Sequence, residues 1–265
     1  MGQLSAAPHI IRFLRHTVAD DLVRVPAGCQ HVRLHLEEGA RAVVTGNFGT
    51  SMVEVVLEEG AHLEILRMVQ ADGTGPCAAQ CLARLAKASC LRAFFFTRGE
   101  HGVSDDIKVA LEGEGAEIFL NGLHVLSGDA RAESNTYIDH VAPATTSNQL
   151  YKCLLRDTAY SLFNGRIMVR REAQLTNAYQ LNKNMLLSTE ARADTRPVLE
   201  IFADDVKCSH GATIGHLDRD QLFYLQTRGI DKASAGEMLM EGFVEDVVGR
   251  ISDPRLKDEV QRSLR

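Results

Sequence analysis

The stretch that decides the fold is Leu36-Glu37-Glu38-Gly39-Ala40, which recurs 21 residues later as Leu57-Glu58-Glu59-Gly60-Ala61. A longer version follows at Leu111-Glu112-Gly113-Glu114-Gly115-Ala116. Before each copy, apolar and polar residues alternate strictly, as in His31-Val32-Arg33-Leu34-His35-Leu36. Alternation with a period of two indicates a β-strand with one buried face. The motif therefore predicts a repeated corner that joins one short strand to the next.

The alternation continues along the chain in pairs such as Ile167/Val169 and Leu199/Ile201. We expect turns with positive φ at Asn121-Gly122, Ser127-Gly128-Asp129 and Asn164-Gly165. Roughly fifteen strands with a period of about 20 residues fit a solenoid of stacked coils. An antiparallel sandwich would give a similar number of strands at a spacing of about 8–12 residues. The repeated corner favours a mainly β protein with a parallel β-helix, because equivalent corners stack in register.

Residues 76–93 allow two interpretations. Cys77 and Cys81 have helical spacing, whereas Phe94–Phe96, just beyond, indicate a strand. The two thiols would be a pair of ligands on one helix face, or two small apolar side chains in a core. We favour the core interpretation.

The periodicity changes after residue 216. Asp218 is placed to cap a helix, with Gln221 three residues later, and Gly229 is placed to end it. A second helix is expected to start near Asp231 and to stop at Asp253-Pro254. Its apolar stripe is Met238, Leu239, Phe243, Val247 and Val248, and a last amphipathic stretch carries Leu256, Val260 and Leu264. We therefore predict a β-helix core over residues 1–216 and a small C-terminal helical domain over 217–265, packed on the solenoid end or on a partner.

Composition excludes several classes of protein. A net charge of −6, with 29 Lys+Arg against 35 Asp+Glu and no dense basic cluster, argues against nucleic-acid binding. No window approaches the ~18 apolar residues of a membrane span. Met1 to Ser5 lack the basic and apolar segments of a secretion signal. We expect a cytoplasmic protein whose six cysteines are reduced thiols.

The densest group of reactive residues is Asp204-Asp205-Val206-Lys207-Cys208-Ser209-His210-Gly211-Ala212-Thr213. Cys208 and His210 are two residues apart, so in a strand both side chains point to one face. Sulfur and imidazole suit Zn²⁺, Fe²⁺ or an iron–sulfur cluster. Two ligands are half a site. Either another chain completes it, or the segment is a polar strand end with a buried thiol.

An enzyme is the alternative from another class. The pairs Asp105-Asp106 and Asp204-Asp205 are similar to the Asp clusters of β-helix sugar lyases, although acidic pairs at turns are usually solvated. The chain has no Gly-x-Ser-x-Gly, Walker-type loop or dinucleotide fingerprint. A β-helix enzyme acting on a carbohydrate or acyl substrate therefore stays open.

A chain of motifs resembles the SufB/SufD family of iron–sulfur cluster assembly proteins. These motifs are Asp139-His140-Val141-Ala142-Pro143, Ser147-x-Gln149-Leu150-Tyr151-Lys152, Phe163-Asn164-Gly165, Ala173-Gln174-x-Thr176-x-Ala178, Asn182-Lys183-Asn184-Met185-Leu186-Leu187-Ser188, the segment from Pro197 to Thr213, and Gln221-Leu222-Phe223-Tyr224-Leu225-x-x-Arg228-Gly229-Ile230. Cys208-Ser209-His210-Gly211-Ala212-Thr213 is similar to the SufD type, since the SufB type carries His-Glu-Ala-Thr there. The family usually has a helical region before its β-helix, whereas alternation here already starts at His31.

The resemblance implies a right-handed parallel β-helix followed by a C-terminal helical domain. It implies a non-catalytic scaffold that pairs with a SufB-type subunit, or with itself as a homodimeric SufB-like scaffold. It implies no permanently bound cofactor, but a transient iron–sulfur cluster at the interface, held by His210 and Cys208 and completed by the partner chain. It also implies that the C-terminal helices bind the ABC-type ATPase SufC. We assign that contact to Gln221, Leu222, Phe223, Tyr224, Leu225, Arg228 and Gly229.

Overall fold

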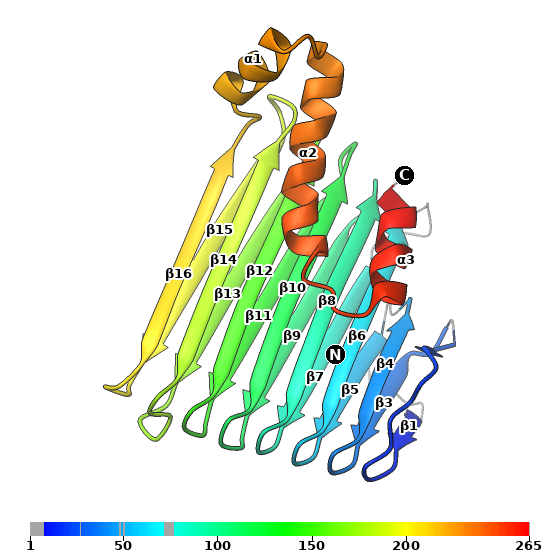
Figure 1. Cartoon of the computed structure of the whole chain (residues 1–265), viewed down its shortest axis with the longest axis vertical. Helices are drawn as coiled ribbons and strands as arrows, with labels where there is room; N and C mark the ends of the chain where they lie inside the picture. Colours follow the sequence, from blue (N-terminus) through cyan, green and yellow to red (C-terminus); the bar gives the residue numbers. More distant parts are fainter. Residues whose placement is uncertain (1–7, 27, 48, 50, 72–76, 265) are drawn as a thin grey trace.

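The computed structural model describes residues 8–26, 28–47, 49, 51–71 and 77–264, so residues 1–7 of the predicted β-helix lie outside it. Within this part of the chain, sixteen strands come first and three helices last (Figure 1). The strands are β1 (His9–Phe13), β2 (Val23–Arg24), β3 (His31–Leu36), β4 (Arg41–Gly46), β5 (Ser51–Leu57), β6 (His62–Ala71), β7 (Cys77–Leu85), β8 (Cys90–Gly99), β9 (Val103–Leu111), β10 (Glu117–Leu126), β11 (Arg131–His140), β12 (Thr146–Leu155), β13 (Tyr160–Val169), β14 (Asn177–Leu186), β15 (Arg192–Ile201) and β16 (Lys207–Gly215).

The strands form two parallel sheets. Sheet A contains the odd-numbered strands from β1 to β15, and sheet B contains the even-numbered strands from β2 to β16. In Figure 1, sheet B runs upward in front and sheet A downward behind, and each later coil lies further to the left. This is a right-handed parallel β-helix, as predicted. Because the described strands pair in parallel, the antiparallel sandwich is excluded.

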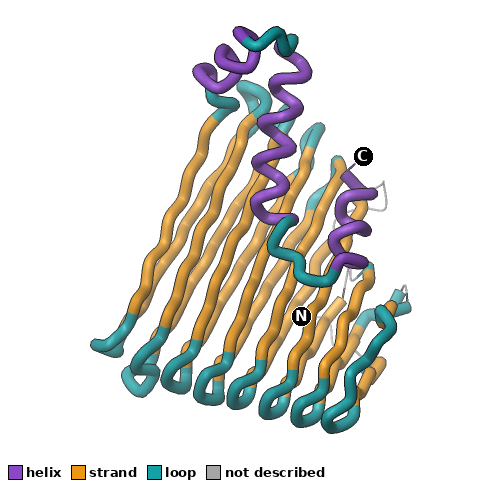
Figure 2. The backbone as a smooth tube through the Cα atoms, viewed as in Figure 1, coloured by secondary structure: helices purple, strands orange, loops and turns teal. Residues whose placement is uncertain are grey.

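The repeated motif forms the stacked corners that close each coil at one edge (Figure 2). Gly39, Gly60 and Gly115 all have φ between 66° and 70°. Each donates its backbone N–H to a carbonyl of the next corner, as Gly39 does to Glu59 at 2.9 Å. The alanines that end the motif copies, Ala40 among them, are fully buried. The glycines therefore permit the turn, and the alanines anchor it in the core.

The predicted period of about 20 residues is right only for the first coils. His62 lies in register with Arg41, 21 residues earlier, but Thr146 lies 29 residues after its partner Glu117. The reason is strand length, since β4 has six residues whereas β10 to β15 have ten each. Later coils therefore repeat about every 30 residues.

Two predicted turns are wrong. Asn121-Gly122 and Asn164-Gly165 lie in the middle of β10 and β13, and neither glycine has a positive φ. Their lack of a side chain serves packing instead. A Cβ on Gly122 would lie 2.3 Å from the ring of Tyr151 on the next coil. Only Ser127-Gly128-Asp129 is the turn that we expected, with φ +62° at Gly128.

The ambiguous segment is a strand. Cys77 and Cys81 belong to β7 and lie on one side of it, about 13 Å apart by strand geometry. That separation is too large for one metal ion. Cys81 packs against the main core between the sheets, which agrees with the core interpretation.

The C-terminal segment forms α1 (Arg219–Thr227), α2 (Lys232–Val248) and α3 (Pro254–Leu264). Asp218 and Asp231 cap α1 and α2 with their side chains, and Gly229 follows α1 with φ +86°, as predicted. The predicted position on the solenoid end is wrong, because α2 and α3 lie along the outer face of sheet B (Figure 1). The surface that they cover is apolar, and it packs Leu66, Phe94, Phe96, Leu123 and Leu150 against Val247, Val248, Ile251, Leu256 and Val260.

Polar contacts fix the same helices to the sheet. The buried Lys152 ammonium on β12 donates to the carbonyl of Phe243 and contacts the Asp246 carboxylate, both at 2.6 Å. The Glu64 carboxylate accepts the backbone N–H groups of Ser252 and Asp253 in the α2–α3 connection. None of the helices in the described residues is long and apolar enough to cross a membrane.

Candidate functional site

The last coil, like the first, has one side on which nothing among the described residues stacks. β15 and β16 end sheets A and B, so each leaves its outer edge unpaired by any described strand. Large apolar side chains are exposed here, among them Val198, Phe202 and Ile214. Long open edges with apolar neighbours favour pairing with another chain.

Both predicted ligands lie on this coil and point the same way. In β16, Cys208 is in register with Ala178 and His210 with Gln180, whose side chains face the space between the sheets. Cys208 is half-buried and packs against the main core. Burial raises the pKa of its thiol, which a hydrogen bond from the backbone of Ala178 partly offsets. His210 is exposed at the mouth of the solenoid.

This arrangement offers one thiol and one imidazole to whatever meets the open end. Within the described part of the chain, no three His, Cys, Asp or Glu residues gather around one position. The thiol would have to lose its proton to bind a metal, whereas the neutral imidazole binds directly. Chemically, the pair can complete a metal or cluster site but cannot enclose one.

The other histidine and cysteine near the motifs belong to the core. Both ring nitrogens of buried His140 have partners, Thr145 Oγ1 at 2.7 Å and Ser147 Oγ at 2.9 Å. Burial lowers the pKa of His140 to about 4. The buried Cys153 thiol contacts Ser161 Oγ at 3.2 Å, and burial raises its pKa to about 12. Neither side chain is available as a ligand.

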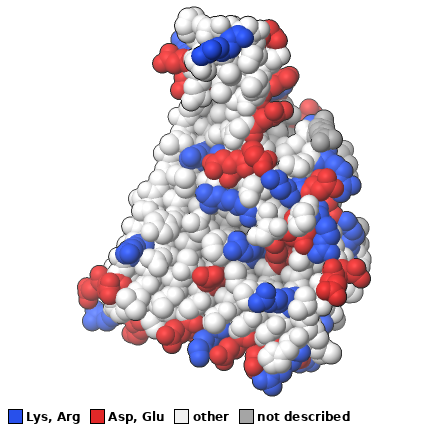
Figure 3. Space-filling model, viewed as in Figure 1, with Lys and Arg blue, Asp and Glu red and all other residues white. Residues whose placement is uncertain are grey.

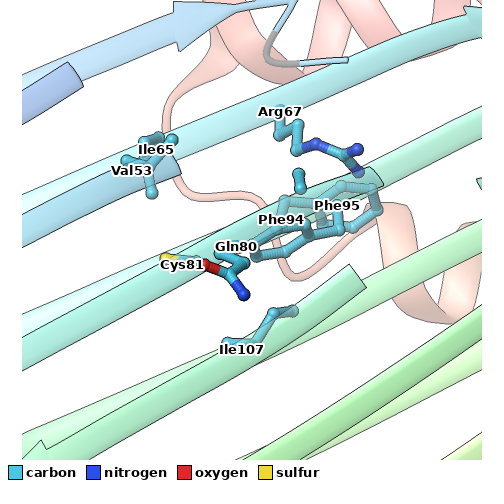
Figure 4. Close-up of a pocket in the computed structure, with 9 residues that line it drawn as sticks. Val53, Ile65, Arg67, Gln80, Cys81, Phe94, Phe95 and Ile107 are labelled. Carbon is cyan, nitrogen blue, oxygen red and sulfur yellow. The ribbon is translucent and has the colours of Figure 1, made fainter. Parts of the chain in front are cut away.

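A small cavity between the sheets is one alternative site (Figure 4). It is lined by Arg67, Cys81, Phe95 and mostly apolar neighbours, and its volume of about 20 Å³ admits about one water molecule. Burial raises the pKa of the Cys81 thiol to about 12, so this sulfur stays protonated. The cavity can hold neither a sugar nor a cluster.

The expectation that the acidic pairs are solvated turns is wrong for Asp105-Asp106. Both residues lie in β9, where alternation sends their side chains to opposite faces. Asp105 is buried and pairs with Arg67 at 2.8 Å, while Asp106 meets Lys108 on the outer face. The proposed sugar-lyase chemistry therefore loses this pair of adjacent carboxylates. Asp204-Asp205 lies in the exposed corner before β16.

The residues that we assigned to the ATPase lie on and just after α1, which extends beyond the sheets (Figure 1). The structure describes all of α1, and none of its residues is buried. Phe223 and Tyr224 are 68% and 57% exposed. Arg228 lies over the Tyr224 ring, with Cζ 5.3 Å from its centroid. An exposed aromatic pair of this kind is typical of protein interfaces.

Sequence reasoning missed a buried polar column that leads to the last coil. Gln149 on β12 and Gln180 on β14 are in register, and His210 follows Gln180. The signal was present in the spacing, because these residues are 31 and 30 positions apart. A period of about 20 residues does not align them.

Comparisons with known proteins agree with the motifs. A family model described as "SUF system FeS cluster assembly, SufBD core domain" matches residues 22–243. The iron–sulfur cluster assembly protein SufD of Escherichia coli (strain K12) is 30% identical over 270 residues, covering 98% of this chain and 63% of that protein. A SufBD family protein of Synechocystis sp. is 33% identical over 217 residues, covering 82% of this chain and 48% of its own.

A SufBD family protein of Mycobacterium tuberculosis is 30% identical over 248 residues, covering 88% of this chain and 62% of that relative. This chain therefore spans about half to two thirds of the length of these relatives.

Proposed function

This chain belongs to the SufBD family of iron–sulfur cluster assembly proteins, and from that premise we propose that it is a SufD-type scaffold subunit. In this proposal it pairs with a SufB-type subunit through its last coil and with a SufC-type ATPase through α1. A nascent cluster is then held as cargo between the two scaffold chains. The chain itself catalyses no reaction.

The observation that carries the proposal is the placement of Cys208 and His210. An inward-facing histidine is buried inside the solenoid, as His140 is on sheet A, but exposed at the open end, as His210 is on sheet B. A partner that stacks on β15 and β16 would cover both side chains and add its own ligands. The site would then be enclosed and complete, as a cluster requires.

The surface around this end supports docking of a second solenoid. The unpaired edges of β15 and β16 supply ten and nine residues of backbone for pairing. Charged side chains gather around α2, α3 and the lower corners, whereas the flank at β14 and β16 shows few (Figure 3). On this face of sheet B, few charged groups would have to lose water on association.

The helices connect the proposed ATPase-binding residues to sheet B, so movement of the ATPase can be transmitted to the solenoid. α1 overhangs the sheets, while the C-terminal half of α2 is fixed to β12 by Lys152 and Asp246. Binding and dimerisation of the ATPase on α1 would therefore act through α2 on sheet B. Opening of the interface would follow if the ATP-bound ATPase binds the opened state more tightly than the closed state.

The first experiment tests the ligands. The chain is co-purified without oxygen with SufB-type and SufC-type proteins of its source organism, and bound iron and sulfide are measured. His210→Ala should lower both while the complex stays intact. The control is His216→Ala, which changes an exposed histidine just beyond β16. Normal iron and sulfide in His210→Ala would remove the ligand role.

The second experiment tests α1. The double substitution Phe223→Ser, Tyr224→Ser should abolish ATPase binding without unfolding, because neither side chain is buried. Truncation after Thr213 is a poorer test, since it also uncovers the apolar outer face of sheet B. Val18→Ser, at the other end of the solenoid and 61% exposed, is the control. Retained binding in the double variant would contradict the assignment.

The third experiment tests the interface and separates a heterodimer from a homodimer. The mass in solution is measured for the chain alone and with the SufB-type protein. Phe202→Asp, which places a charge beside the open edges, should dissociate either dimer. Ile10→Asp, at the opposite end and 57% exposed, should not. A monomeric mass for the chain alone, and again in the presence of the SufB-type protein, would refute pairing through the last coil.

A further inference from the structure

Three buried polar side chains are joined by hydrogen bonds inside the solenoid, Gln180 to Gln149 along its axis and Gln149 to Thr136 across one coil. Gln149 Nε2 on β12 donates to Thr136 Oγ1 at 2.8 Å, and Gln180 Nε2 on β14 donates to Gln149 Oε1 at 2.8 Å. All three are at most 3% exposed. Gln149 Oε1 therefore faces the following coil, and Gln180 uses its Nε2 to bond back to the preceding one.

The column ends in an open acceptor. Gln180 Oε1 is buried and has no hydrogen-bond partner among the described residues. A buried acceptor of this kind is costly unless a donor reaches it. Gly165, opposite on β13, leaves room for the amide, since a Cβ there would lie 2.4 Å from Gln180 Nε2.

The next coil places one side chain above that acceptor. His210 is the register partner of Gln180, on a neighbouring strand about 4.8 Å away and on the same face. On sheet A, the residue that follows Gly165 in register is Pro197, which has no N–H to offer. An imidazole N–H from His210, on the strand that pairs with β14, is therefore a donor that suits this oxygen.

We propose that Gln180 is a positioning residue for His210. Its Oε1 accepts one imidazole N–H, which fixes the tautomer and directs the lone pair of the other ring nitrogen out of the solenoid mouth. This inference rests on the proposed ligand role of His210 and deepens it. Hydrogen bonds to the second nitrogen orient metal-binding histidines in the same manner.

The test reads the tautomer directly. The intact chain is labelled with ¹⁵N-histidine, the His210 signals are assigned with His210→Ala, and spectra are recorded at a pH where the ring is neutral. In the unchanged chain the two ring nitrogens should have well-separated shifts, one protonated and one not. Gln180→Met, which keeps the length of the side chain but removes the acceptor, should collapse that separation toward the average of a freely exchanging ring.

A matched control is one inward position further along β14. Asn182→Ala changes a buried amide whose register partner is Ala212, so the His210 shifts should not move. If Gln180→Met does not fold, Gln149→Met serves instead, because it frees the Gln180 amide to turn over and should reduce the same separation. Averaged shifts in the unchanged chain, or unchanged shifts in both glutamine variants, would overturn the proposal.

Cluster assembly gives the second readout. Gln180→Met in the co-purified complex should weaken the affinity for iron by about 10- to 100-fold, as loss of such outer partners does elsewhere, and bound iron should fall. If His210→Ala leaves iron binding normal but Gln180 still fixes the tautomer, only the ligand role fails. If His210→Ala abolishes iron binding while the tautomer ignores Gln180, only the positioning role fails.

Discussion

His140 on sheet A and His210 on sheet B both face the interior of the solenoid, but their surroundings are opposite. His140 ends β11 in the middle of the stack, fully buried with both ring nitrogens bonded. His210 lies on β16, where no described strand follows, and its ring is exposed. The comparison teaches that position along the axis, and not residue type, separates a core histidine from a candidate ligand.

The largest expected effect is in the middle coils, at the buried ion pair of Arg67 and Asp105. Asp105→Ala should lower the free energy of unfolding by about 3–5 kcal/mol, because it leaves the Arg67 guanidinium buried without its carboxylate. Urea unfolding measures the change. The neighbouring Asp106→Ala, on the outer face, should cost less than about 0.5 kcal/mol. Equal losses in the two variants would contradict the claim that an unpaired charge costs more inside the stack than on its surface.

A pH titration sharpens the comparison through His140. Burial lowers the pKa of this ring to about 4, against 6.5 for the unperturbed group. Between these values the unfolded chain binds a proton that the native chain does not, so stability is full above pH 6.5 and falls toward pH 4. The loss from this one ring is about 3 kcal/mol. His124, whose pKa burial also lowers to about 4, adds to it.

Unfolding free energies at several pH values provide the measurement. His140→Gln should be less stable at pH 7 but should show a shallower decline below it. Parallel curves for the variant and the unchanged chain would contradict the origin of the effect.

Replacing a glycine by alanine in a middle coil and in the last coil compares the packing of the two regions. Gly122→Ala in β10 should cost about 1–3 kcal/mol, because the new methyl group meets the enclosed Tyr151 ring. Gly211→Ala in β16 should cost less, since its Cβ would lie 3.1 Å from the flexible end of Leu181. Thermal unfolding ranks the two, and a reversed order would contradict the packing argument.

The smallest effect belongs to the candidate ligand. His210→Ala should lower the free energy of unfolding by at most about 1 kcal/mol, because the ring is exposed and the proposed hydrogen bond to Gln180 is the main contact that it loses. The same urea experiment applies. A loss as large as that of Asp105→Ala would show that His210 is structural and would contradict its contrast with the buried His140.

Much of the fold follows from local chemistry that the sequence displays. Alternation requires strands, Gly39 and Gly60 permit the stacked corners, and Asp218 and Asp231 cap the helices. The positions of Gly122 and Gly165 within strands could not be predicted in the same way. The sequence does not distinguish a glycine that leaves room for a neighbouring ring from one that permits a turn. The ring of Tyr151 is 29 residues away along the chain.

For the site, the sequence by itself determined that Cys208 and His210 share one face of a strand, because side chains in a strand alternate. Only the tertiary structure decided that this strand is the last of the stack, that Gln180 lies beneath His210, and that the helices cover sheet B rather than the open end. The physical reason is that register and layer order arise from contacts between residues about 30 positions apart, which no local pattern encodes.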